Sequence, residues 1–211
     1  NQKLNYNFFP RPHFTTKASL IIENQKNIAE INQIKIYVSL DNLFSIKNFN
    51  INEVILEKAN FELNNKNSNF FFKILNNNFL DTNLKIQNSN LFFRNLEKEV
   101  LFISKIKNMK YYHDQSELKN TLYLENEIFN TPFSLKVIDD KDKKKLYSKL
   151  NLDFAKLQIE NIFNYGEDTK SGSANLFFNK KKSLLNYETN KNFFEFNYHD
   201  ELDKKKFLYN G

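Results

Sequence analysis

The sequence predicts a mainly β protein: a long, curved antiparallel sheet, arranged as a groove or taco-like meander, with one short helix. Apolar and polar residues alternate with a period of two through several segments, as they do in strands with one apolar face. Charged and polar clusters separate these segments, as turns do. A five-residue pattern also recurs along the chain, which favours an elongated meander over a closed core.

Two strands are expected in the first third of the chain. Residues 28–38 (IAEINQIKIYV) and residues 51–63 (INEVILEKANFEL) both alternate. The side chains of the second strand that we expect on one side are Ile55, Ala59, Phe61 and Leu63.

The helix is expected between these two strands, near residues 39–46. Ser39 or Asp41 can cap its first turn by accepting hydrogen bonds from free backbone N–H groups. The apolar residues that follow have the i, i+3 and i+4 spacing of one helix face: Leu40, Leu43 and Phe44.

The recurring pattern consists of a small residue, Asn, an apolar residue, any residue and a second apolar residue. It occurs at residues 59–63, 89–93 and 174–178. In a strand, the small residue and Asn indicate a bend or a close approach, and the two apolar positions after them point to the same face. The chain is therefore expected to reuse one β unit.

Later segments predict further strands and a hairpin. Apolar and polar residues alternate in residues 133–137 and again in residues 146–154. If the two segments form a hairpin, their apolar residues lie on one side of the sheet. A third run alternates near residue 196. The apolar residues expected to form one strip are Phe133, Leu135 and Val137, then Leu150, Leu152 and Phe154, and in the third run Phe194 and Phe196.

Two charged segments are near copies, DDKDKKKL at residues 139–146 and DELDKKKF at residues 200–207. Each lies between two strand-like runs, and Asp and Lys are typical of a solvated hairpin loop. We therefore expect both segments to turn the chain. The alternative is that their lysines contact anionic headgroups, each contributing about 1 kcal/mol near such a surface.

Composition excludes several kinds of site. The 31 basic and 25 acidic residues are interspersed, so the net charge of +6 does not predict a dedicated nucleic-acid surface. With Cys 0, the chain has no disulfide, thiolate metal site or cysteine nucleophile, although the compartment stays open.

Nothing in the sequence predicts catalysis. The histidines, His13, His113 and His199, are isolated from other metal-ligand residues, and each is expected in a solvated loop. Residues 165–175 (YGEDTKSGSAN) lack the spacing of a phosphate-binding loop. We therefore expect no enzyme, no metal and no cofactor.

No apolar run approaches the 18 or so residues of a membrane span. The first residues, NQKLNYNFFP, contain neither an initiator Met nor a signal-peptide core. We expect residues 1–211 to be a single β domain excerpted from a longer, membrane-anchored protein.

Residues 10–75 resemble the opening of the AsmA-like family of bacterial envelope proteins. The likeness lies in the order of a Pro-containing entry, an Ala-initiated strand, a Ser-Leu-x-x-Leu segment, a basic turn and a further strand. Residues 126–137 (NEIFNTPFSLKV) resemble the polar turn, Pro-Phe and alternating strand that recur in this family. The positions concerned are Pro10, Pro12, Ala29 to Val38, Ser39 to Leu43, Lys47, Asn48, Ile51 to Leu63, Asn69 and Phe70.

The resemblance implies a periplasmic protein, anchored to the inner membrane through a missing N-terminal segment, that supports phospholipid transport between the inner and outer membranes and outer-membrane biogenesis. Its implied partners are phospholipid acyl chains and other envelope proteins, without nucleic acid. Physical chemistry supports this function, because one short helix leaves much of an apolar face uncovered and each buried CH₂ of an acyl chain contributes about 0.8 kcal/mol. The groove residues expected are Ile55, Phe61, Leu63, Phe133, Leu135, Val137, Leu150, Leu152, Phe154, Phe194 and Phe196.

Two alternatives remain open. The chain can be a structural or scaffolding β domain of the envelope, whose apolar face packs against a second sheet as in most β proteins. It can also be a β barrel that binds oligosaccharide or nucleic acid, with aromatic side chains stacking on the ligand. Whether the apolar face is open or closed separates the first alternative from lipid binding.

Overall fold

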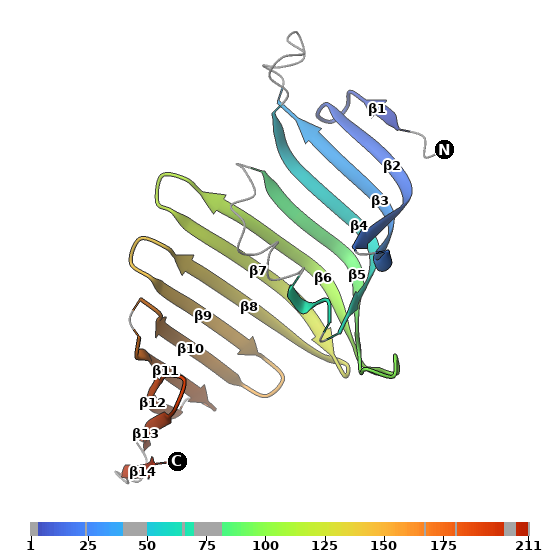
Figure 1. Cartoon of the computed structure of the whole chain (residues 1–211). Coiled ribbons are helices and arrows are strands. Elements are labelled where there is room, and N and C mark those ends of the chain that lie inside the picture. Colours follow the sequence, from blue (N-terminus) through green and yellow to red (C-terminus); the bar gives the residue numbers. More distant parts are fainter. Residues whose placement is uncertain are drawn as a thin grey trace. The chain divides into compact units, whose positions relative to one another are not determined.

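The computed structural model describes residues 4–23, 25–39, 50–64, 66–69, 82–166, 168–179, 181–200 and 206–210. Within these ranges, the chain consists almost entirely of strands joined by short turns (Figure 1). The strands are β1 (Asn5–Asn7), β2 (His13–Glu23), β3 (Lys26–Val38), β4 (Ile51–Leu63), β5 (Asn83–Arg94), β6 (Val100–Asp114), β7 (Lys119–Ile128), β8 (Thr131–Asp140), β9 (Lys145–Leu152), β10 (Leu157–Asn164), β11 (Lys170–Phe178), β12 (Lys181–Thr189), β13 (Phe194–Asp200) and β14 (Lys206–Asn210).

The strands follow one another in the sheet in chain order, from β1 to β14. Pairs with a defined register are antiparallel, apart from β4 and β5, which run parallel. Among the described residues, β1 and β14 do not pair, so the sheet is open. The prediction of a mainly β, largely antiparallel sheet is confirmed, and this open strand order is not that of the barrel alternative.

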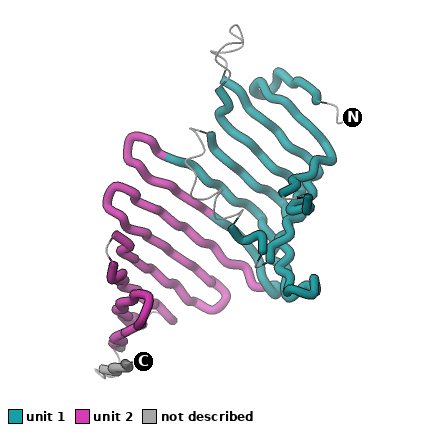
Figure 2. The backbone as a smooth tube through the Cα atoms, viewed as in Figure 1, with its two compact units in different colours: residues 1–113, 124–130 teal, residues 114–123, 131–211 magenta. Residues whose placement is uncertain are grey.

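Two compact units divide the chain. Unit 1 comprises residues 1–113 and 124–130, and unit 2 comprises residues 114–123 and 131–211 (Figure 2). The two units are described separately below.

The strands predicted at residues 28–38 and 51–63 are confirmed as β3 and β4. The predicted helix near residues 39–46 lies, except for Ser39, outside the described residues. At Ser39 itself, the backbone N–H donates to the carbonyl oxygen of Asn50 at 3.2 Å, which joins the ends of β3 and β4.

Three strands of unit 1 contain a residue in the left-handed backbone region. These residues are Ala18 in β2, Lys58 in β4 and Asn88 in β5, with φ of 52°, 53° and 50°. The registers place Lys58 and Asn88 side by side, and they place Ala18 and Lys58 on the two sides of Asn32 in β3. The left-handed residues therefore form a line across neighbouring strands, which we call the crease.

At the crease, the positions of β4 that point to the core change from even-numbered to odd-numbered residues. In β4, Val54 and Leu56 contact the buried cluster before the crease, and Ala59 and Phe61 contact it afterwards. A regular strand places residues i and i+2 on one face. The left-handed residue Lys58 shifts this alternation by one position, so the cluster stays on one side of the sheet.

Two copies of the recurring sequence pattern begin immediately after the crease. Residues 59–63 of β4 and residues 89–93 of β5 pair in parallel and in register. Asn90 Nδ2 donates to Asn60 Oδ1 at 2.9 Å, and the Ala59 N–H donates to Ser89 Oγ at 2.9 Å. The pattern is thus a structural repeat in unit 1. The third copy, residues 174–178, lies in β11 of unit 2.

Unit 1 has a buried core. Its central side chains come from β3, β4, β5 and β6, and partly buried apolar residues from β2 and β7 pack around them. The central residues are Ala29, Ile31, Leu56, Ala59, Phe61, Ile86 and Ile106.

Candidate binding surfaces of the sheet

Unit 2 carries a row of apolar side chains on one side of its sheet. Leu135 of β8 lies opposite Leu150 of β9, and Leu150 lies opposite Ile159 of β10. Partners that lie directly opposite each other project from the same side. We call the set that shares this side the apolar strip: Phe133, Leu135, Val137, Leu146, Leu150, Leu152, Leu157, Ile159, Phe163, Leu176, Phe178, Leu185, Phe194 and Phe196.

The predictions for the hairpin and the third run together placed about half of these residues correctly. The register brings the predicted sets of β8 and β9 to one side, and the predicted pair Phe194 and Phe196 lies on the same side of β13. Prediction missed the contributions of β10, β11 and β12, namely Leu157, Ile159, Phe163, Leu176, Phe178 and Leu185. Alternation in the segment LQIENIF, residues 157–163, is a signal that could have identified β10.

Phe154 does not belong to the strip, and its predicted place there is wrong. Strand β9 ends at Leu152, and Phe154 lies in the turn that leads to β10, with 84% of its surface exposed. A turn ends the alternation of the strand, so a period-two pattern cannot be extended through residues 153–156.

The apolar strip is not covered. Among the described residues of unit 2, no apolar side chain larger than that of Ala174 is buried. Leu135, Leu150 and Ile159 are half-buried, and Phe194 is 49% exposed. Close packing against a second layer would bury such residues almost completely. This part of the sheet is therefore a single layer with an accessible apolar face.

Polar side chains interrupt the strip near its middle. Asn161 lies opposite Ser148 and Ala174, and its Oδ1 accepts a hydrogen bond from the Tyr187 hydroxyl at 3.0 Å. The Tyr187 ring covers Gly172, because a Cβ atom at Gly172 would lie 2.1 Å from the ring atom Cζ. The tyrosine thus satisfies the amide oxygen while its ring stacks with Phe163 at 6.2 Å.

The groove candidates of unit 1 are arranged differently. Phe61 belongs to the buried core and is 6% exposed, and Leu63 is half-buried. Ile55 was expected on the same side as Phe61, but the crease separates them. Ile55 lies opposite Lys35 and beside Lys85, outside the core cluster. Three residues expected on one accessible face therefore occupy different environments, and two of them are already covered, because Ile55 is 8% exposed and Phe61 is 6% exposed.

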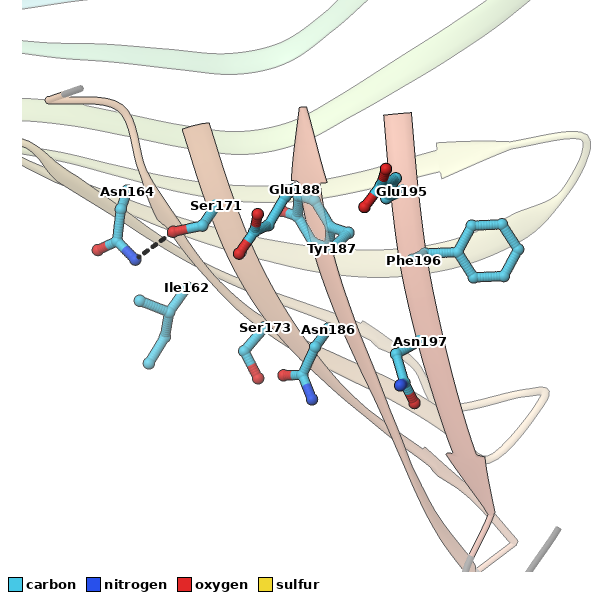
Figure 3. Close-up of a pocket in the computed structure, with 11 residues that line it drawn as sticks. Ile162, Asn164, Ser171, Ser173, Asn186, Tyr187, Glu188, Glu195, Phe196 and Asn197 are labelled. Atoms are coloured by element: carbon cyan, nitrogen blue, oxygen red, sulfur yellow. Dashed lines mark hydrogen bonds between the residues drawn. The ribbon is translucent and has the colours of Figure 1, made fainter. Parts of the chain in front are cut away.

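The other side of the sheet in unit 2 is largely polar, although Ile138, Ile162 and Leu184 lie there. It contains a shallow hollow of about 530 Å³ between β10, β11, β12 and β13 (Figure 3). Glu188 and Glu195 lie directly opposite each other there, and Asn164 Nδ2 donates to Ser171 Oγ at 3.3 Å. In Figure 3, Phe196 projects away from the polar side chains around the hollow. Two exposed carboxylates repel phosphate groups, so this hollow does not suit nucleic acid.

Both charged segments join strands, as predicted. Residues 141–144 form the turn between β8 and β9, and the second segment joins β13 to β14, with residues 201–205 outside the described ranges. The first turn is held by Asp140, whose buried Oδ1 accepts from the Lys143 N–H at 3.0 Å. The Tyr165 hydroxyl also stabilises this turn by donating a hydrogen bond to Asp139 Oδ1 at 2.7 Å. Burial and this hydrogen bond raise the pKa of Tyr165 to about 12.

His13 does not lie in a solvated loop. It is a buried residue of β2, it stacks on Tyr37 with ring centroids 4.8 Å apart, and its Nδ1 lies 2.7 Å from the Arg11 carbonyl oxygen. His113 and His199 lie near the ends of β6 and β13. Within the described ranges, no three His, Cys, Asp or Glu residues gather in a way that could hold a metal ion.

Comparison with known proteins adds no assignment. No protein-family model matches this chain, and no curated protein matches it. In the part of the chain that the structure describes, no helix is both long enough and apolar enough to cross a membrane.

Proposed function

We propose that this chain binds lipid acyl chains along the apolar strip of unit 2 and thereby supports phospholipid transport between the inner and outer membranes of a bacterial envelope. The proposed setting is periplasmic, in a protein anchored to the inner membrane. This setting rests on the resemblance of residues 10–75 to AsmA-like proteins. The proposal includes no catalysis, no metal and no cofactor.

The observation that carries the proposal is the uncovered apolar strip. Unit 1 buries its apolar side chains in a core, whereas the strip in unit 2 stays half-exposed. An apolar surface of this kind is rare on a soluble protein unless it binds something. The strip offers no convergent set of charged groups, which suits a ligand held by its tail.

The dimensions of the strip support an acyl chain as the ligand. Strands lie about 4.8 Å apart, so the five intervals from β8 to β13 span roughly 24 Å. One leaflet of a bilayer is about 15 Å of hydrocarbon, so a tail of ordinary length fits within the strip. Burying six methylene groups would contribute about 5 kcal/mol, which is enough for reversible binding.

A charged residue in the strip tests the proposal. In Leu135→Asp, the carboxylate reaches water from the open face, so the sheet stays folded, whereas an acyl chain would have to pass a hydrated ion. We expect circular dichroism like that of the unchanged chain and at least tenfold weaker binding of a fluorescent fatty acid. Leu152→Asp is expected to behave in the same way. Native mass spectrometry of the unchanged chain, purified without detergent, is expected to detect mixed phospholipids.

Ser173→Asp is the matched control, because it places the same charge in β11 on the polar side of the sheet. It is expected to bind fatty acid normally. If Leu135→Asp unfolds or aggregates while Ser173→Asp does not, the strip is a closed core in solution, which supports the scaffolding alternative. A lipid-free chain without affinity for fatty acid would also contradict the proposal.

A further inference from the structure

Two neighbouring turns of unit 2 end in exposed aromatic side chains. Phe154 lies in the turn between β9 and β10 and is 84% exposed, and Phe178 ends β11 and is 58% exposed. The backbone N–H of Asn179 donates to the Lys156 carbonyl oxygen at 3.0 Å, which joins the two turns. Both rings therefore project from the same end of the strands.

Lysines accompany the rings. Lys156 follows Phe154 in its turn, and Lys181 and Lys182 begin the strand that follows Phe178. All three are exposed, and none of them forms a salt bridge with another described residue. Asp153 is an exposed acidic residue in the first of these turns. Among the residues named here three lysines outnumber one aspartate, so an excess of positive charge and apolar rings occur together at this end.

The turns at the opposite end of these strands differ in character. Their exposed residues include Asp142, Lys143, Lys144, Lys191 and Asn192, and the exposed aromatic side chain at that end is the strip residue Phe194, which begins β13 and is 49% exposed.

The connection between β6 and β7 lies beside the 141–144 turn at this opposite end of the strands, because the Lys141 N–H donates to the Leu118 carbonyl oxygen at 3.2 Å. Leu118 is 48% exposed, and the neighbouring Glu117 pairs with Lys119 at 2.6 Å. Leu118 thus combines exposure with locally paired charges, which makes it a suitable control position.

We propose that Phe154, Phe178, Lys156, Lys181 and Lys182 form a membrane-docking end that inserts its two rings into the interface of a bilayer with anionic headgroups. Exposed rings gain by leaving water, while lysines beside them can remain at the level of the phosphates. The net positive charge complements an anionic surface.

The shape of this end favours a bilayer over a protein partner. Phe154 stands in a turn and Phe178 at the end of β11, and both are mostly exposed, whereas the side chains around a protein binding hot spot exclude water from it. A bilayer interface accepts separate side chains and needs no matching pocket. Unit 1, taken by itself, also has exposed apolar side chains in turns, because Leu96 is 68% exposed and Phe129 is 77% exposed.

This inference goes beyond the proposed function, because docking to a membrane surface does not require the apolar strip to hold a tail. Phe178 belongs to both surfaces, but Leu135 belongs only to the strip and Phe154 only to the docking end, so the two proposals can fail independently. Leu135→Asp is expected to lose fatty-acid binding and to keep vesicle binding, since Leu135 lies in β8, outside the docking end.

The absence of tryptophan from the chain allows a direct test. In Phe154→Trp, the new indole is the sole tryptophan, and its emission reports on its surroundings. We expect a blue shift and quenching by brominated lipids when vesicles of phosphatidylcholine with one third phosphatidylglycerol are added. Leu118→Trp is the control, and its emission is expected to stay that of an exposed indole. An unchanged Phe154→Trp spectrum would overturn the proposal.

Substitutions then separate the contribution of the rings to vesicle binding from that of the lysines, as measured by vesicle co-sedimentation. The double variant Phe154→Ser/Phe178→Ser is expected to bind these vesicles at least tenfold more weakly, while Leu118→Ser binds normally. Replacing Lys156, Lys181 and Lys182 with Gln is expected to weaken binding by about fivefold per lysine, and to have no effect with pure phosphatidylcholine. Replacing Lys143 and Lys144 with Gln is the control at the opposite turns, compared per lysine removed.

Three results would contradict the docking end. The Phe154→Ser/Phe178→Ser variant could bind vesicles like the unchanged chain. Lys143→Gln/Lys144→Gln could weaken binding as much as the docking-end lysines do, which would place the contact at the opposite turns. The serine variant could instead change the oligomeric state in analytical ultracentrifugation, which would show that the rings contact a second copy of the chain.

Discussion

Glu53 is a buried carboxylate in unit 1 that forms ion pairs with Arg11 and Lys85. It is 5% exposed, Arg11 Nη2 lies 2.8 Å from its Oε2, and Lys85 contacts its other oxygen. Burial raises the pKa of Glu53, but the hydrogen bonds from Lys85 and Arg11 outweigh burial, so the pKa is held below its ordinary value of 4.5. Arg11 also lies over the Tyr37 ring, with 4.4 Å between Cζ and the ring centroid.

The ion pairs of Glu53 predict a pH-dependent contribution to stability. A carboxyl whose pKa is lowered on folding stabilises the protein above its unfolded pKa, and this contribution is lost as the pH falls through the folded value. We expect Glu53→Gln to lower the free energy of unfolding of unit 1 by about 2 kcal/mol at neutral pH, because Lys85 and Arg11 lose their partner. Urea unfolding at several pH values measures the difference, which should shrink below pH 4.5.

Glu160→Gln is the control for Glu53→Gln. Glu160 pairs with Lys149 at 2.8 Å, but both side chains are about 40% exposed. Exposed pairs contribute little, so this substitution is expected to change stability by no more than about 0.5 kcal/mol. An equal effect of both substitutions at every pH would show that burial of Glu53 does not matter.

At the scale of elements, the crease is the feature that distinguishes β2, β4 and β5 from regular strands. Side chains other than glycine adopt left-handed backbone at a cost of about 1 kcal/mol or more, and Asn tolerates it best. The chain has only Gly 3, and places Ala, Lys and Asn at the crease instead. Two in-register copies of the sequence repeat follow it, so the crease is part of the repeated unit.

A β-branched residue tests the crease. Lys58 is exposed, so a substitution acts mainly through the backbone. We expect Lys58→Val to destabilise unit 1 by about 1–2 kcal/mol, because Val strongly disfavours left-handed backbone, and Lys58→Asn to be neutral or slightly stabilising. Thermal unfolding measures both changes.

Asn52→Val supplies the comparison for Lys58→Val, since Asn52 is an exposed β4 residue without positive φ. There, Val is expected to be neutral or favourable, as in other strands. Equal tolerance of Val at both positions would contradict a left-handed Lys58.

At the scale of the whole molecule, the two units differ in how far they bury their apolar side chains. Unit 1 buries a cluster drawn from several strands, and the described part of unit 2 leaves a half-exposed strip. The difference decides which residues are available for binding and which maintain the fold.

Truncation of one residue from each unit measures this difference. Phe61→Ala is expected to cost unit 1 about 3–5 kcal/mol, because it leaves a cavity in a packed core. Leu150→Ala in the strip is expected to cost about 1 kcal/mol, since a half-exposed side chain loses less on removal. Urea unfolding monitored separately for each unit, by hydrogen exchange, measures both. A cost for Leu150→Ala as large as that for Phe61→Ala would mean that the strip is covered in solution.

The sequence by itself determined what depends on short-range periodicity. Alternation predicted β3, β4 and the β8–β9 hairpin with its common face, because a strand repeats every two residues whatever it pairs with. The charged segment at residues 139–146 predicted a turn, because Asp and Lys are solvated there. About half of the apolar strip followed from these local patterns.

The tertiary structure decided what depends on single backbone angles and on distant partners. One left-handed residue, Lys58, reverses the alternation of β4 and moves Ile55 away from the face of Phe61. The small residue and Asn that follow it predicted a bend, but not a positive φ or a change of face. Parallel pairing of β4 with β5, burial of His13 against Tyr37 and the exposed position of Phe154 likewise depend on neighbours far along the chain or on where a strand ends. Periodicity assigns side chains to faces, but pairing and packing decide which faces are covered, because burial is a property of the assembled sheet.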